Sequence, residues 1–260
     1  MVSGKGSKIE GCVRSNFKAI RSKDLQLHHL PPYCKLQKLN IQAPNLATLE
    51  FADDMIPIVL GESIKISEAT IKLFSLSDCL GYVFAELVKT LSHVQSLSIN
   101  FRIQTEVQEF VKNPTRLTCL RHVVLKIDIC GFSENVAGIL RLAYVLELAP
   151  VLEELVLHMC CFQSASYFFE PSEDVLPSCP HKHLKTVLMT GFYGFRGQFE
   201  LALHILRNSI CLERMIIDPV VRNNTIIPSL KSAERDITRG RQLARDNLLG
   251  KGFGKVVRIV

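Results

Sequence analysis

The sequence predicts an α/β chain in which short parallel strands alternate with helices. The first observation is the segment Leu152–Cys160, which reads L-x-x-L-x-L-x-x-C. Leucines two residues apart are typical of a strand that buries alternate side chains. The second observation is that the pattern recurs at Ile71–Cys79 with conservative replacements, and more loosely at segments that start at Leu36, Leu46, Val94, Leu120, Leu184 and Leu212. Helical patterns fall between most copies, and such alternation implies a parallel sheet.

A recurring unit of about 20–29 residues with this core is the leucine-rich repeat. The sequence therefore predicts a solenoid with parallel strands on its concave face and with helices and irregular chain on its convex face. The leucines are expected to face the interior, while the residue between them faces outward. The closing Cys is expected to turn the chain. The alternative is an ordinary α/β domain in which these spacings arise by chance. One match would not separate the two, but several copies with helical patterns between them favour the repeat.

The first predicted strand is 24–27, and further strands follow at each copy of the motif. The copies at Leu36 and Leu46 are too close for a parallel crossover, which takes about a dozen residues or more. Pro44 and Asn45 therefore predict a tight turn between two antiparallel strands, unless one of the two matches is accidental. A last strand is predicted over 255–260.

Apolar residues three and four positions apart predict the helices 82–91, 104–112, 134–149, 198–208 and 229–248. Ser133 is a suitable N-cap for the third of these, and Pro150 ends it. Gly240 weakens the last helix, and Gly250 is expected to stop it. Three prolines oppose regular structure within 163–180, which predicts an insertion there.

The composition is that of a folded soluble protein, with 260 residues of which 47% are hydrophobic and 22% charged. No apolar run approaches the roughly 18 residues of a membrane span. The first residues lack the apolar segment of a signal peptide, so we expect a cytoplasmic or nuclear protein. The nine cysteines are odd in number, and most of them are spread singly, as at Cys79, Cys119 and Cys211. They are expected to be free thiols packed as small hydrophobes.

The net charge of +6 is concentrated in the two ends, 1–23 and 229–260, whereas the body between them is mildly acidic. A nucleic-acid reader needs its basic residues gathered on one binding face of a recognised fold. Tryptophan is absent, and aromatic residues do not alternate with basic ones. We therefore expect neither nucleic acid nor membrane as a partner.

Three groups of residues carry weak chemical signals. The glycines of Leu249–Arg258 approach a kinase nucleotide loop, but the third arrives one residue early and no catalytic loop follows. Ser3–Lys8 lacks the spacing of a phosphate loop. The last group could hold zinc but contains no C-x-x-C pair; it is Cys160, Cys161, Cys179, His181 and His183. The sequence thus predicts no catalytic residue, no metal site and no cofactor, and a chain that is not an enzyme.

Several blocks resemble plant F-box/leucine-rich-repeat proteins, particularly those of grasses. They are Leu39–Phe51, Ile56–Ser63, Cys179–Val187, Gly191–Leu206 and Leu212–Pro219. The last two, GFYGFRGQFELALHIL and LERMIIDP, look like the FBD module found near the C-terminus of those proteins. The resemblance covers about residues 25–260 and is most specific over 179–219.

In that family an N-terminal F-box of several dozen residues binds the Skp adaptor of a cullin-based ubiquitin ligase, and the repeats select the protein to be ubiquitylated. The residues before Asp24 are few and lack the Leu-Pro…Leu-Pro opening of an F-box. The resemblance therefore implies the recognition half without the F-box, and it makes Skp adaptor and cullin doubtful partners. The expected parts are a basic, flexible N-terminus over 1–23, repeats over 24–178, and an FBD-like cap over 179–260 that continues the solenoid.

Together these features predict a non-catalytic scaffold that binds an unknown target protein noncovalently. It resembles the substrate-binding part of an SCF-type F-box ubiquitin-ligase subunit. The candidate contact residues are outward positions between the leucines: Asn40, Glu50, Ser75, Ser98 and Val156. One alternative is a truncated or degenerate relative without ligase function that competes for the same target. Another is an enzyme with an unrecognised site.

Overall fold

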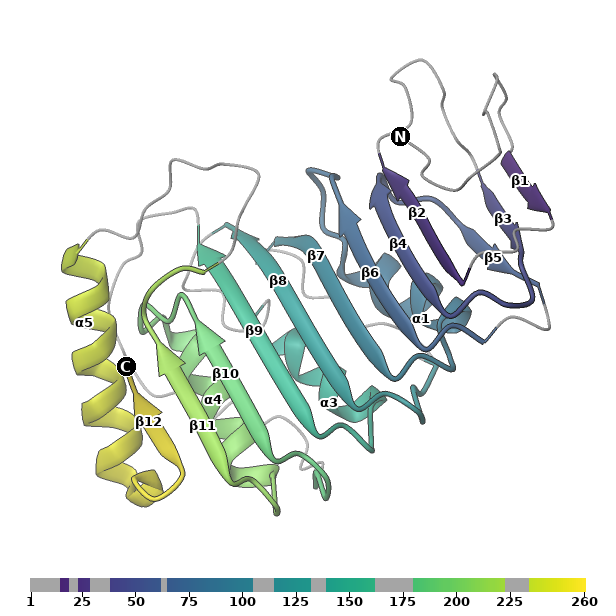
Figure 1. Ribbon diagram of the computed structural model, residues 1–260. Coiled ribbons are helices and arrows are strands. Elements are labelled where there is room, and N and C mark those ends of the chain that lie inside the picture. The colour runs from purple at the N-terminus through teal and green to yellow at the C-terminus, as the bar shows by residue number, and fades with distance from the viewer. Residues whose placement is uncertain are drawn as a thin grey trace.

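A computed structural model describes residues 15–18, 23–28, 38–61, 65–104, 115–131, 139–161, 180–222 and 234–260. Within these residues the strands form two sheets, and the strands of each sheet pair in parallel. The larger sheet has nine strands in the order β12-β11-β10-β9-β8-β7-β6-β4-β2, and the smaller has the order β1-β3-β5. The strands of the large sheet thus lie side by side in the order in which they occur along the chain, while β3 and β5, which intervene in sequence, belong to the small sheet (Figure 1). The chain has the α/β fold with a parallel sheet that its sequence predicts.

The strands are β1 Ser15–Lys18, β2 Asp24–His28, β3 Leu39–Gln42, β4 Thr48–Asp53, β5 Ile58–Leu60, β6 Glu68–Leu73, β7 Ser96–Gln104, β8 His122–Cys130, β9 Glu154–Cys161, β10 Thr186–Thr190, β11 Arg214–Asp218 and β12 Val257–Ile259. The helical elements are η1 Tyr82–Leu87, α1 Val88–Thr90, η2 Arg141–Ala143, α3 Tyr144–Leu148, α4 Arg196–Asn208, α5 Glu234–Ala244 and η3 Arg245–Phe253.

The first coils of the chain contain two strands each, one in either sheet. β3 pairs with β1 and β5, whereas β4 pairs with β2 and β6. The expectation of an antiparallel β3–β4 pair is therefore wrong. A turn closed by the Leu46 N–H donating to the Ala43 carbonyl at 3.0 Å carries the chain from one sheet to the other. The minimum crossover length applies to parallel strands of one sheet, so it sets no limit here. β1 lies within the segment 1–23 that the sequence predicts to be flexible.

After β6, helices take the place of the strands of the small sheet. The hydroxyl of Thr90 donates to the Ile58 carbonyl at 2.8 Å, and that of Tyr82 donates to the Ile56 carbonyl at 2.5 Å. Both bonds join the helical segment η1–α1 to the segment that contains β5. Burial raises the pKa of Tyr82 to about 12, so this donor stays protonated at neutral pH. α1, α3 and α4 lie behind the large sheet in Figure 1, on one of its faces.

One backbone contact repeats from coil to coil and fixes the register of the large sheet. The carbonyl of Arg121 accepts the N–H groups of both Glu153 and Glu154, at 2.9 and 3.0 Å. The same double contact recurs at the equivalent carbonyls, which belong to Lys23, Ala47, Ser67, Gln95, Glu153 and Lys185. Apart from Lys23, which follows Ser22, each carbonyl belongs to the residue after the first apolar position of a motif. The copies at Leu46, Val94, Leu120, Leu152, Leu184 and Leu212 are therefore placed as the sequence predicts.

The copy predicted to start at Ile71 starts at Ile66 instead. β6 places Ala69 and Ile71 where β9 has Leu155 and Leu157. Because Ala69 stands where the motif has leucine, the pattern that starts at Ile66 is weak. The segment that starts at Ile71 resembles the motif more closely by chance. Leu76, assigned to the core by that match, has an exposed fraction of 71%.

The predicted helix 82–91, the predicted helix 198–208 and the described parts of 134–149 and 229–248 are confirmed, whereas Gln104, the one described residue of 104–112, ends β7. Val83, Phe84, Leu87, Val88 and Leu91 are all buried, as the pattern in 82–91 requires. α3 ends at Leu148, before Pro150, and α4 spans the expected 198–208. The predicted helix 104–112, most of which falls in 105–114, and the start of 134–149 lie outside the described residues, as does most of the predicted insertion 163–180.

Two details near the ends of elements differ from expectation. The helix that follows α5 runs through Gly250 to Phe253, and its irregular residue is Gly252, with φ of 91°. Cys160 is buried as predicted, but it does not turn the chain, because β9 continues to Cys161. The six cysteines in the described part of the chain are free, and Cys211 is exposed instead of packed.

Candidate protein-binding face

The large sheet has one face on which side chains remain partly exposed, here called the open face. In β7, Leu97, Ile99, Phe101 and Ile103 are buried, while the residues between them are partly exposed. Parallel strands that are covered on both sides read as continuous apolar runs. The strict alternation in β7 therefore separates an inner face, which builds the core, from the open face.

Side chains on the open face line up in rows because the strands are in register. The middle row consists of Gln26, Glu50, Thr70, Ser98, Val124, Val156, Leu188, Ile216 and Arg258. The N-terminal row, two residues earlier on each strand, consists of Asp24, Thr48, Glu68, Ser96, His122, Glu154, Thr186 and Arg214. The C-terminal row, two residues later, includes Lys72, Asn100, Lys126, His158, Thr190 and Asp218.

The structure brings three of the five predicted contact residues into the middle row: Glu50, Ser98 and Val156. The other two placements are wrong. Asn40 lies on β3 in the small sheet. A strand that packs on the core from the opposite side alternates in the same way, so the local pattern does not tell the two sheets apart. Ser75 lies in the loop after β6, where its hydroxyl is 2.7 Å from that of Ser77. That error follows from the misplaced copy at Ile71.

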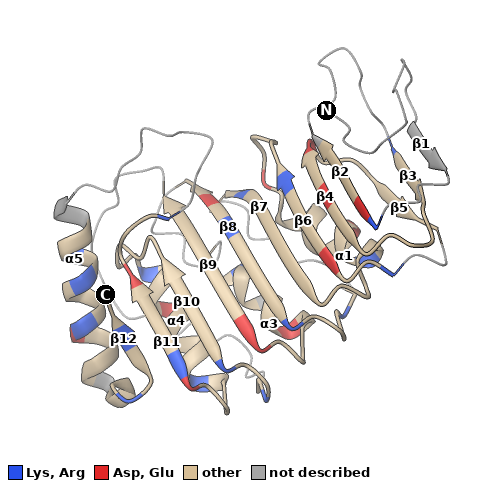
Figure 2. Cartoon of the chain, in the orientation of Figure 1, with Lys and Arg blue, Asp and Glu red and all other residues tan. Residues whose placement is uncertain are grey.

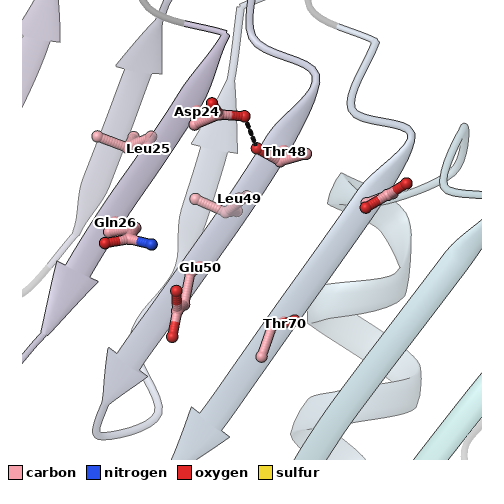
Figure 3. Close-up of a pocket in the computed structure, with 8 residues that line it drawn as sticks. Asp24, Leu25, Gln26, Thr48, Leu49, Glu50 and Thr70 are labelled. Carbon is pink, nitrogen blue, oxygen red and sulfur yellow. Dashed lines mark hydrogen bonds between the residues drawn. The ribbon is translucent and has the colours of Figure 1, made fainter.

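A shallow hollow of about 310 Å³ lies on the open face over β2, β4 and β6 (Figure 3). Its polar lining is Asp24, Gln26, Thr48, Glu50, Glu68 and Thr70. The Thr48 hydroxyl donates to the Asp24 carboxylate, which joins the first two strands. Three carboxylates on neighbouring strands make this end of the face acidic. Sequence reasoning found only Glu50 of this group, since the others lie side by side only through strand pairing.

The middle row becomes aliphatic over the next strands. Val124, Val156, Leu188 and Ile216 are neighbours on β8, β9, β10 and β11, and each is only partly buried. We call these four residues the aliphatic stripe. Of these four residues, only Val156 is among the predicted contact residues, although the residue between the two apolar positions is aliphatic in each of these motif copies. That repetition was the available signal.

Ion pairs link the same strands at their N-terminal ends. Nδ1 of His122 lies 3.3 Å from the Glu154 carboxylate within the N-terminal row. Glu153, just before β9, accepts from Lys185 at 2.9 Å and also contacts Arg121. Hydrogen bonds from these two cations, Lys185 first, lower the pKa of Glu153. The cations of these pairs are about half exposed, so solvent screens the pairs and they contribute little to stability.

A model of the At1g61320/AtMIF1 leucine-rich-repeat domain matches residues 20–249, which is most of the chain. This chain belongs to that leucine-rich-repeat domain family. No curated protein and no solved structure matched it. Membership fits the repeated carbonyl contact and the rows described above, and it indicates a scaffold for protein interaction.

The distinctive block 191–198 of this leucine-rich-repeat domain is organised around the buried amide of Gln198. Its Oε1 accepts the N–H groups of Tyr193, Gly194 and Phe195 at 3.0–3.3 Å, and its Nε2 donates to the Gly191 carbonyl at 2.9 Å. A side chain that satisfies four backbone groups of one loop holds that loop in a single conformation. The block therefore has a structural role between β10 and α4.

Two glycines pack this loop against its neighbours. Gly191 has φ of 68°, and a Cβ there would lie 1.9 Å from the Met159 carbonyl oxygen of β9. A Cβ at Gly240 of α5 would lie 2.3 Å from the Phe192 carbonyl oxygen. Gly240 is thus required for the close approach of α5 to the loop, although by helix propensity alone it is unfavourable.

A buried ion pair closes the coils around β6 and β7. The guanidinium of Arg141 in η2 donates to Asp78 Oδ2 at 2.7 Å and to the Gln104 carbonyl at 2.9 Å. Asp78 also accepts the N–H groups of Leu80 and Gln104, at 3.1 and 2.8 Å. The pair joins the loop after β6, the end of β7 and the helical segment after β8.

The C-terminal ends of the middle strands carry buried polar groups on the open side. Asp128 of β8 is only 1% exposed, and burial raises its pKa to about 6, against the opposing effect of Arg102. His158 lies 2.9 Å from the Thr190 hydroxyl, and burial, followed by the charges of Lys126 and Arg222, lowers its pKa. Asp128 is thus buried although it lies on the same side of the sheet as the three rows.

The chemical signals of the sequence do not converge within the described residues. In that part of the chain, no group of three or more His, Cys, Asp and Glu side chains could hold a metal ion. Burial raises the pKa of Cys161, and burial followed by the charge of His204 lowers that of His181 to about 4. Cys179 lies outside the described residues. Among the helices that are described, none is long and apolar enough to cross a membrane.

Proposed function

We propose that this leucine-rich-repeat domain is a non-catalytic scaffold that binds another protein on its open face. The observation that carries the proposal is the middle row, which extends in register across nine strands and changes from polar to aliphatic along its length. Partly exposed aliphatic side chains bordered by polar rows have the composition of a protein interface. Family membership supports the same class of function.

Site-specific photo-crosslinking tests the proposal directly. A photoreactive residue is placed at Ser98 or Val156 of the open face and, as the matched control, at Lys89 of α1, whose side chain is 55% exposed. Each variant is incubated with a plant extract, and the cross-linked proteins are identified by mass spectrometry. The two open-face positions should capture one common protein that Lys89 does not. Capture of the same proteins from all three positions would contradict the proposal.

A finer proposal is that the partner is a ubiquitylation substrate and that the chain resembles the recognition part of an SCF-type F-box ubiquitin-ligase subunit. The resemblance of 179–219 to the FBD module supports it, as does the position of β10, β11 and β12 at one end of the large sheet, where a cap would cover the apolar end of the repeats. A pulldown for Skp adaptor and cullin separates this role from that of a relative without ligase function. Failure to recover either protein would exclude ligase membership for this chain.

A further inference from the structure

The charge of the open face is ordered along the sheet. At the β2–β6 end, the N-terminal and middle rows carry Asp24, Glu50 and Glu68. The cation that β6 places on this face is Lys72, which lies in the C-terminal row. Its ammonium is 5.3 Å from the centre of the Phe74 ring. Figure 2 shows acidic residues in red on the strands at the β2–β6 end and basic residues in blue on β11 and β12. The two ends of the same rows therefore have opposite sign.

The basic end consists of Arg214 in the N-terminal row and Arg258 in the middle row, both exposed. Asp218, the acidic residue of β11, is 4% exposed, and its carboxylate accepts a hydrogen bond from Arg222 at 2.6 Å. Its charge is thus compensated within the protein, while the two arginines face outward. Between the two ends, the Glu154 carboxylate lies 3.3 Å from Nδ1 of His122.

The aliphatic stripe lies between these charged ends and is one side chain wide. Val156 and Leu188 are flanked by Glu154 and Thr186 on one side and by His158 and Thr190 on the other. Rows two residues apart on a strand are separated by about 6.6 Å, whereas a helix with its side chains is about 10 Å wide. A stripe of this width fits an extended segment better than a helix.

We propose that the open face binds an extended segment of another protein that is aliphatic at its centre, basic over the hollow at β2–β6, and acidic over Arg214 and Arg258. This inference rests on the proposed function and specifies the partner. Charge complementarity at both ends orients the segment, and burial of the stripe supplies affinity. A segment with the opposite order of charges would place like charges together at each end.

Strand spacing sets the dimensions of the segment. The stripe covers three strand intervals, roughly 14 Å at about 4.8 Å each, which matches aliphatic residues at positions i, i+2 and i+4 of an extended chain. From β4 to β12 the distance is roughly 34 Å, or about ten extended residues. The acidic residue should follow the aliphatic group within about two residues, and the basic residue should lie about four residues from it on the other side.

Selection from a random library of peptides about 12 residues long, which covers that distance, tests the inference on the full chain. The counter-selection protein is Val156→Asp/Leu188→Asp. The matched control is Val59→Asp on β5 of the small sheet, where the side chain is 43% exposed. Circular dichroism and thermal melting check that each protein is folded. If the double variant does not fold, Val156→Thr/Leu188→Gln replaces it.

Enriched peptides should have a basic end, an alternating aliphatic centre and an acidic end. By fluorescence polarisation, their affinity should fall at least about tenfold in the stripe variant and stay unchanged in Val59→Asp. Arg214→Glu/Arg258→Glu should weaken the same peptides by a similar factor and prefer peptides with lysine at the formerly acidic end. Glu86→Lys on η1, whose side chain is 62% exposed, is the charge control and should have no effect.

Two results would overturn the inference and leave the proposed function standing. Enriched peptides whose binding depends on the stripe but shows no order of charges would refute the oriented segment. A selection that enriches no stripe-dependent peptide would refute an extended partner segment, and the photo-crosslinking experiment would then decide separately whether the open face binds a folded protein.

Discussion

Replacing Arg141 with methionine should destabilise the protein far more than replacing an exposed lysine. The Arg141 side chain is 2% exposed and that of its partner Asp78 is 12% exposed. Methionine fills a similar volume but leaves the Asp78 carboxylate without its cation and the Gln104 carbonyl without one of its donors. Removing one member of a buried ion pair costs about 3–5 kcal/mol, because the remaining charge stays buried.

The structure places this variant near the lower end of that range. Asp78 keeps the backbone N–H groups of Leu80 and Gln104 as donors, so its charge remains partly stabilised. We therefore expect a loss of about 3 kcal/mol in the free energy of unfolding. In a protein of this size such a loss lowers Tm by about 6–12 °C. Adding Asp78→Asn should restore part of the loss, because it removes the unpaired charge while its one amide oxygen still accepts from one of the two backbone donors.

Urea unfolding at pH 7, followed by circular dichroism, measures the free energies of unfolding of the wild type, of Arg141→Met and of the double variant Arg141→Met/Asp78→Asn. The control is Lys89→Met, since the Lys89–Glu86 pair spans 3.5 Å on an exposed helical surface and should contribute less than about 0.5 kcal/mol. If Arg141→Met and Lys89→Met shift the midpoint equally, the buried pair does not join the coils as described. If Asp78→Asn makes the Arg141→Met protein less stable still, the stranded charge is not the source of the loss.

Three further predictions concern buried groups. Burial raises the pKa of Asp128 from 3.8 to about 6, so its contribution to stability is present below about pH 4 and is lost as pH rises through 6. The free energy of unfolding of Asp128→Asn, measured in urea titrations, should therefore gain up to about 3 kcal/mol relative to wild type between pH 4 and pH 7. An unchanged difference between the two proteins would contradict this. Gly191→Ala should lose at least about 2 kcal/mol, whereas Gly81→Ala, with φ of −60° and open space around it, should be neutral or slightly stabilising by thermal melting. Gln198→Met should raise the hydrogen-exchange rates of the loop amides that Gln198 binds, and unchanged rates would show that other groups hold the loop.

The motif copies predicted most of the strands because the signal is local. At Leu152–Cys160, alternate apolar residues and the preceding leucine are all buried, and the same positions are buried in the other correctly placed copies except at Leu212, which is partly buried. The copy at Ile66 was missed because Ala69 stands at a leucine position while Phe74 and Leu76 mimic the pattern downstream. Sequence alone cannot weigh that alternative against the pairing of β6 with its neighbours on both sides.

The contact residues were harder to predict than the strands. Asn40 satisfies the same local rule as Glu50, because a strand that packs on the core from either side alternates in the same way. Only the pairing of β3 with β1 and β5 assigns it to the small sheet. The acidic hollow and the aliphatic stripe likewise depend on which residues of neighbouring strands come side by side.

The sequence by itself determined the repeat, the parallel α/β arrangement and the inward side of each well-placed strand, because burial of alternate side chains acts within a few residues. The tertiary structure alone decided which sheet a strand joins, which outward residues form a row, and how charge is ordered from β2 to β12. Those properties arise from hydrogen bonds between strands that are about 20–30 residues apart along the chain, and no local pattern records them.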